Sequence, residues 1–169
     1  MAFHAAATNF EGVPHTWKWS VTWLRFRKSG QVTTTGSSWD ASEAFGGTGG
    51  LLTVQAAAGN KKASISAQLQ GTNPTGNAVV QYLKTQPNSI GFDKILQHES
   101  RMTHFTFRGE PKRSFDNGFG IAQLTSPAPT FEQCWDWKKN VDGGLALFAA
   151  KQRLLCGPHT RLALRYFWQ

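Results

Sequence analysis

Apolar and polar residues alternate through the first half of the chain, whereas helical spacing prevails in the second half. Between Thr16 and Trp23 the alternation is strict, and three tryptophans share one face. This period of two predicts a β-strand with one apolar face. Residues 51–58 and 63–70 alternate in the same way, and the Gly59-Asn60 pair between them is typical of a hairpin turn. The first half therefore predicts a small antiparallel β unit.

Breaks in these patterns predict the remaining boundaries. The alternation changes parity at Leu24, which predicts a bulge, and Ser29-Gly30 predicts a turn before a short strand over residues 31–35. Beyond the Gly-Thr-Asn-Pro segment that follows the last strand, apolar residues recur at helical intervals. We therefore predict an α+β chain, with a sandwich-like β-rich unit over residues 1–73 and a mainly α-helical domain over residues 74–169.

Composition and charge indicate a folded, cationic protein. Of the 169 residues, 40% are hydrophobic and 12% are aromatic, which is enough for a packed core, and the formal net charge is +8. Residues 1–87 carry seven basic and three acidic side chains, and residues 88–169 carry eleven and seven. The positive charge is thus spread over both halves, without the basic arm that would favour nucleic acid. Charge alone does not choose between an anionic membrane surface and an anionic cell wall.

The sequence carries few signals of cellular compartment. Cys134 and Cys156 lack metal-ligand spacing and can be free thiols or one disulfide, of which we favour free thiols. No apolar run is long enough to span a membrane. Residues 1–12 lack the basic and apolar regions of a signal peptide. We therefore expect that any export uses another route, or that the chain is part of a larger protein.

A glutamate stands on the apolar face of a predicted helix. Phe92, Ile95 and Leu96 recur at i, i+3 and i+4, and Glu99 occupies the i+7 position on the same face. A carboxyl group that points inward is costly unless it is protonated or paired. Such an environment suits a general acid that works near neutral pH. The alternative is a glutamate that is merely capped or salt-bridged, and the residues that follow favour catalysis.

The residues around this glutamate resemble the superfamily of goose-type lysozymes and soluble lytic transglycosylases. Glu99-Ser100 matches the Glu-Ser pair that ends the catalytic helix of that family. Ser114, Gly120 and Gln123 match the spacing of its Ser-x-x-Gly-x-x-Gly-Leu-Met-Gln segment. The resemblance implies a lysozyme-like fold for the helical domain.

The chain departs from the family pattern at some positions and resembles the family over only part of its length. Asn117 stands where the first glycine is usual, and Ile121-Ala122 replaces Leu-Met. Further on, residues 140–144 are similar to the Asn-x-x-x-Gly helix start of the family. The similarity covers roughly residues 88–155. The Tyr-Asn-x-Gly segment that helps to wall the sugar groove is not found before Gln169, so we expect a C-terminally trimmed domain or a fragment.

The resemblance implies a reaction on peptidoglycan. Glu99 would protonate the glycosidic oxygen between N-acetylmuramic acid and N-acetylglucosamine. In goose-type lysozymes a loop aspartate then positions water; Asp116 lies near that place, and Glu110 is a second candidate. In lytic transglycosylases the muramoyl C6 hydroxyl attacks instead, and no second carboxylate is needed. Asp116 favours hydrolysis, although Asp-Asn-Gly is also a common turn.

Four further residues would bind the glycan. Gly118 and Gly120 would let the backbone approach the sugar. By resemblance, Gln123 would hydrogen-bond an N-acetyl group or the reacting water, and Ser114 would support the loop at the edge of the groove.

We expect neither a metal nor another cofactor, because His98 and His104 lack zinc-ligand spacing. The alternative to an enzyme is a non-catalytic cell-wall-binding module, which the tryptophan-rich first half suggests. We expect Trp17, Trp19 and Trp23 to form a core face rather than to stack on sugars.

The predicted partner is the glycan strand of peptidoglycan, met in the periplasm or on the cell wall. An antibacterial effector that is delivered by a secretion system would fit, as would a phage lysin. An immunity protein is a further expected partner in the effector case only. Neither a nucleic-acid partner nor an integral membrane segment is expected.

Overall fold

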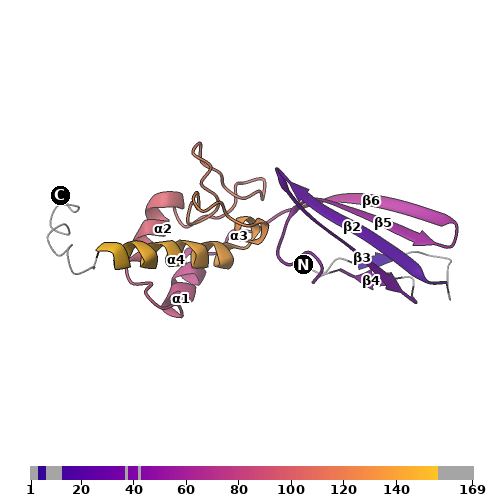
Figure 1. Cartoon of the computed structure of the whole chain (residues 1–169), viewed down its shortest axis with the longest axis horizontal. Helices are drawn as coiled ribbons and strands as arrows, with labels where there is room; N and C mark the ends of the chain where they lie inside the picture. Colours follow the sequence, from indigo (N-terminus) through magenta and orange to yellow (C-terminus); the bar gives the residue numbers. More distant parts are fainter. Residues whose placement is uncertain (1–3, 7–12, 37, 42, 156–169) are drawn as a thin grey trace.

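The computed structural model describes residues 4–6, 13–36, 38–41 and 43–155. The strands in these ranges are β1 (His4–Ala6), β2 (His15–Trp23), β3 (Phe26–Thr34), β4 (Ser38–Asp40), β5 (Gly50–Ala58) and β6 (Lys61–Leu69). The helices are α1 (Gly76–Lys84), α2 (Phe92–Ser100), α3 (Phe131–Trp135) and α4 (Trp137–Leu155). The large sheet and the helices α1, α2 and α4 lie at opposite ends of an elongated molecule, with α3 between them (Figure 1).

The large sheet has four antiparallel strands in the order β3-β2-β5-β6. The predicted hairpin at Gly59-Asn60 is confirmed, since β5 pairs with β6 from Ala58 and Lys61 outward. The bulge at Leu24 and the turn at Ser29-Gly30 are wrong. Leu24, with a φ of 50°, lies in the hairpin turn itself, and β3 runs straight through Ser29-Gly30. Gly30 is needed there because a Cβ would lie 2.7 Å from the Trp19 ring.

The apolar face of this sheet forms a core, as the tryptophan pattern predicted. Trp17 is 2% exposed and Trp23 is 9% exposed, and the half-buried Trp19 packs against the same cluster. The short β1–β4 ladder covers part of this face, with the Trp39 ring 6.2 Å from that of Trp17. The expected sandwich is therefore wrong, because the face is covered by a two-stranded ladder and by aromatic residues from the second half.

Aromatic contacts join the sheet to the second half of the chain. The Phe26 ring stacks on Phe131 at 5.3 Å, and Trp23 meets Trp135 edge to face at 5.5 Å. These rings belong to one buried cluster with residues from β2, β5 and α3. The two halves thus share a core, although the element type changes between Leu69 and Gly76.

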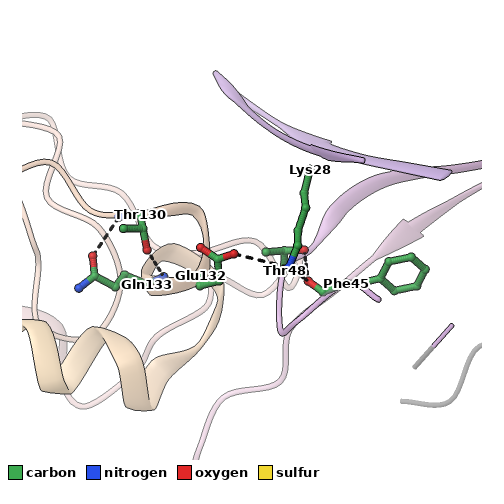
Figure 2. Close-up of polar contacts among 6 residues, drawn as sticks. All are labelled: Lys28, Phe45, Thr48, Thr130, Glu132 and Gln133. Atoms are coloured by element: carbon green, nitrogen blue, oxygen red, sulfur yellow. Dashed lines mark hydrogen bonds and ion pairs between the residues drawn. The ribbon is translucent and has the colours of Figure 1, made fainter. Parts of the chain in front are cut away.

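Polar contacts reinforce this junction beside α3 (Figure 2). Lys28 reaches from β3 to Glu132, with Nζ 3.6 Å from Oε1, and donates to the carbonyl oxygen of Phe45 at 3.4 Å. Thr130 and Gln133 form a capping box, since each side chain bonds the backbone of the other residue. The cap starts α3 at the position that brings its aromatic residues against the sheet.

The expected mainly helical, lysozyme-like second domain is wrong. Helices make up 29% and strands 32% of the structure, and the sheet is the largest element. Residues 101–130 between α2 and α3 contain no helix and are held by isolated bridges, such as Phe119 with Leu124. The physical reason is that prolines and left-handed residues interrupt this segment; Asn117 and Gln123 have φ values of 65° and 49°. A second buried cluster, which includes Leu96, Ile121 and Val141, lies among α1, α2, α4 and this segment.

Candidate active site

A pocket of about 690 Å³ lies between α2, the loop that follows residue 113, and α4. Its walls are Phe92, Ile95 and Glu99 of α2, Ser114, Phe115, Asp116 and residues 122–126 of the loop, and Gly144, Leu147, Phe148 and Lys151 of α4. Segments that are distant in sequence therefore bring four of the predicted site residues together, namely Glu99, Ser114, Asp116 and Gln123.

Glu99 borders this pocket rather than the core. Its side chain is 44% exposed, and the buried stripe of α2 is Phe92, Leu96 and Ser100. The inward position expected from the apolar spacing is therefore wrong. The physical reason is that Glu99 follows Phe92 and Ile95 along the neighbouring edge of the helix, which faces the pocket. Nδ1 of the neighbouring His98 ring lies 4.0 Å from Oε1 of Glu99.

Ser114 and Asp116 form a tight turn at the lip of the pocket. The Ser114 hydroxyl donates to Oδ1 of Asp116 and accepts a 2.9 Å hydrogen bond from the N–H of Gly118. The hydrogen bond from Ser114 lowers the pKa of Asp116, so this exposed carboxyl is ionised at neutral pH. Asn117 completes the turn at a φ of 65°, a left-handed conformation that asparagine tolerates better than most residues.

Gly118 and Gly120 were predicted to let the backbone approach a sugar, but both lie against other atoms of the protein. Neither Gly118 nor Gly120 is among the residues that line the pocket, and both are buried. A Cβ on Gly118 would lie 2.7 Å from Oγ of Ser114, and one on Gly120 would lie 2.4 Å from Cε1 of His104. Gln123 does line the pocket, and its side-chain N–H donates to the carbonyl oxygen of Gly120 at 2.6 Å.

Two buried polar residues hold the backbone that carries Gln123. Nδ1 of His104 accepts a 3.0 Å hydrogen bond from the N–H of Ile121, so the ring proton is on Nε2, which donates to the carbonyl oxygen of Cys134 at 2.8 Å. Asn140 accepts from the N–H of Ala122 and donates to the carbonyl oxygen of Phe119. Burial lowers the pKa of His104 from 6.5 to about 4, so the ring is neutral at pH 7. These positioning roles were missed from the sequence, where His104 was considered as a metal ligand and rejected.

Close packing of α4 forms the far wall of the pocket. A Cβ on Gly144 would lie 2.8 Å from both Cβ of Ala122 and Cζ of Phe92. Glycine at this position therefore lets the helix approach α2 and the loop. The Phe148 ring lies 5.5 Å from that of Phe92, which gives the pocket an apolar floor.

An aromatic residue at the rim was also missed. Phe115 is fully exposed and lies between the two polar residues of the turn. The only signal in the sequence was a phenylalanine in a predicted loop beside a candidate carboxylate. A fully exposed phenylalanine at a pocket rim is placed where it can contact a ligand.

Other candidates lie elsewhere. Glu110 is exposed in the turn that begins at Thr106, and it does not line the pocket. His98 is 89% exposed on the last turn of α2. Cys134 is a buried free thiol whose pKa is raised to about 12 by burial, whereas Cys156 lies outside the described residues. Within the described ranges, no group of three or more His, Cys, Asp or Glu side chains could hold a metal ion. No helix in the same ranges has the length and apolarity needed to cross a membrane.

No protein-family model, curated protein or solved structure matches this chain.

Proposed function

We propose that the protein cleaves the glycan strand of peptidoglycan in the α2–α4 pocket, with Glu99 as the proton donor. The observation that carries this proposal is the convergence of Glu99, Ser114, Asp116 and Gln123 on a single pocket, although the residues come from a helix and a separate loop. The proposal concerns the site and not the fold, because unrelated folds can carry the same chemistry.

The pocket offers the surfaces that a sugar chain needs. Phe92 and Phe148 supply an apolar floor, and the exposed Phe115 can pack against the face of a sugar ring. Gln123 and the Ser114–Asp116 turn place polar groups along one side, where they can bond hydroxyl and N-acetyl groups. Lys151 adds a positive charge at the rim, which suits the carboxylates of wall peptides.

Glu99 would act first. Its carboxyl proton passes to the glycosidic oxygen, and the C1–O bond breaks with its electron pair moving to that oxygen. In the free protein the side chain is 44% exposed. A sugar ring seated over Phe92 and Ile95 would exclude water from Glu99, and a desolvated carboxyl favours the neutral form that can donate a proton.

The second step decides between two reaction types. An ionised Asp116 supports hydrolysis, because a carboxylate at the lip of the pocket can orient a water molecule toward C1. The proton of that water would pass to the carboxylate left on Glu99. The alternative is a lytic transglycosylase, in which the muramoyl C6 hydroxyl attacks C1 and yields a 1,6-anhydro end.

The test compares Glu99→Gln with Glu110→Gln in the full chain, acting on purified peptidoglycan. The Glu99 change should reduce muropeptide release by at least about 100-fold, whereas the exposed Glu110 lies outside the pocket and its change should leave release intact. Circular dichroism checks that both variants fold. Release by Glu99→Gln at the rate of the unmodified protein would overturn the assignment, and loss only in Glu110→Gln would move the role to Glu110.

Mass spectrometry of the products separates the reaction types. The hydrolase is supported if the products carry reducing ends and if Asp116→Asn no longer forms these products. Anhydromuramic ends that persist in Asp116→Asn would support the transglycosylase instead. If the protein binds purified walls but neither it nor any variant releases fragments, it is a non-catalytic wall-binding module and the enzymatic proposal fails.

A further inference from the structure

The face of the large sheet opposite the tryptophan core presents a regular array of polar side chains. Strand register places Gln31, Lys18, Gln55 and Ser64 in one row across the four strands. The next row along the strands is Ser29, Ser20, Thr53 and Ser66, and the hydroxyls of Thr53 and Ser66 are 3.2 Å apart. Side chains in one row point to the same face of a sheet, so they form a continuous surface of hydroxyl and amide groups.

This surface is hollowed rather than flat. One depression of about 300 Å³ lies over β2, β5 and β6, and a second of about 490 Å³ lies over β3, β2 and β5. Lys18 and Gln55 line both depressions, so the two lie side by side across the strands, and together they are called the groove.

The charge of the groove has one sign. Lys18 and Lys62 line the first depression, and Lys18 and Arg27 line the second. Within the described strands, no acidic side chain projects from this face. Cations without acidic neighbours attract an anionic partner, and the attraction falls as salt is added.

The side chains also select the kind of anion. Proteins that hold single-stranded nucleic acid stack its bases on aromatic residues, whereas Trp19, the one aromatic residue that lines either depression, packs its ring against Phe45 on the core face. Serine, threonine and glutamine instead match the hydroxyl groups of a sugar. We infer that this groove binds a linear acidic polysaccharide, whose carboxylates meet Lys18, Arg27 and Lys62 while its hydroxyls bond the polar rows.

The experiment measures binding of the full chain to oligogalacturonate, with neutral dextran and a single-stranded oligonucleotide of equal charge as competitors. Lys18→Gln combined with Lys62→Gln should weaken oligogalacturonate binding by about tenfold, since two charge contacts are lost. The matched control is Lys84→Gln combined with Lys94→Gln, which removes the same charge from exposed lysines on α1 and α2 and should leave binding unchanged.

Each result decides the inference. Equal losses in both double variants would show that net charge alone attracts the polymer, and the groove site would be rejected. Tighter binding of the oligonucleotide than of oligogalacturonate would assign the groove to nucleic acid instead. The inference does not depend on catalysis in the pocket. Glu99→Gln should keep oligogalacturonate binding, and the Lys18/Lys62 variant should keep any release of soluble muropeptides, so the two proposals fail separately.

Discussion

The side-chain oxygen of Asn140 accepts a hydrogen bond of 2.8 Å from the backbone N–H of Ala122. This bond ties the first turns of α4 to the segment that presents Gln123 to the pocket. The amide nitrogen of Asn140 donates at 3.0 Å to the carbonyl oxygens of Phe119 and of Gln133. One fully buried side chain therefore fixes the loop, α4 and the end of α3 with respect to one another.

Replacing Asn140 by alanine should destabilise the fold by about 3 kcal/mol, because buried backbone groups lose their partners. Urea unfolding followed by tryptophan fluorescence measures this change. Asn77→Ala is the matched control, since Asn77 is an exposed asparagine on α1, and it should cost less than about 0.5 kcal/mol. Equal costs for the two variants would contradict the proposed role of the buried amide.

Stability should fall in acid through His104. The pKa of this ring is about 4 in the folded protein against an ordinary value of 6.5, so below pH 6.5 the unfolded chain binds the proton more readily. The contribution of the neutral ring is complete above pH 6.5 and is lost as the pH falls to about 4. It amounts to about 3 kcal/mol.

The measurement is urea unfolding at a series of pH values for the unmodified protein and His104→Gln. The difference in pH dependence between the two isolates the ring from the carboxyl groups that titrate in the same range. The exposed His98 provides the control His98→Gln, whose free energy of unfolding should fall with decreasing pH as steeply as that of the unmodified protein. If His104→Gln keeps the full slope as well, the acid sensitivity lies elsewhere.

A contact between α1 and α4 should be visible in a tyrosine titration. The Tyr82 hydroxyl donates to Oδ1 of Asp142 at 2.7 Å. Partial burial, together with this hydrogen bond, raises the pKa of Tyr82 to about 12. Asp142→Asn should bring that pKa down toward its ordinary value of 10.0, because the negative charge and the carboxylate acceptor are removed.

Ultraviolet absorbance of the tyrosinate reports this change. Tyr166→Phe serves as the background in both proteins, because the chain has two tyrosines and only Tyr82 then titrates. An unchanged midpoint in Asp142→Asn would mean that the hydrogen bond does not form in solution.

Gly120 offers a test of packing behind the pocket. Its φ is 73°, and an added Cβ would lie 2.4 Å from Cε1 of His104 and 2.6 Å from Nδ2 of Asn140. Gly120→Ala should therefore cost about 3 kcal/mol, from backbone strain and overpacking together. Gly59→Ala separates the two effects, since Gly59 has a φ of 56° with no atom near the added Cβ, and it should cost about 1 kcal/mol. Similar losses in thermal or urea unfolding would argue against the close contact with His104.

Strand patterns were more informative than helix patterns in this sequence. Alternation located β2, β5 and β6 because one face of each is apolar, and Gly59-Asn60 fixed their hairpin. The β2–β3 turn was misplaced because Gly30 resembled a turn residue, whereas its role is to accommodate the Trp19 ring. Such cross-strand packing cannot be inferred from local sequence.

The candidate site was predicted in part. The segment around Glu99 and Gln123 was identified from its residue types, and Glu99 was expected on the buried face, but it lies on the neighbouring edge of α2. A helical period distinguishes faces only to within about one residue. A residue near the end of a short helix can therefore be assigned to the buried face although its side chain borders a pocket. The roles of His104 and Asn140 depend on backbone groups many residues away, which spacing alone does not indicate.

The aromatic stack at the junction also determines how the molecule unfolds. It consists of Phe26 against Phe131 and of Trp23 against Trp135. Neither the sheet nor α3 can leave this stack without exposing aromatic surface on the other, so the chain should unfold in a single cooperative step. The amide hydrogens of β2 and α4 should then exchange with deuterium through the same global opening. A glycan bound only in the pocket would then slow deuterium exchange in the distant sheet as much as it slows exchange in the residues next to the glycan.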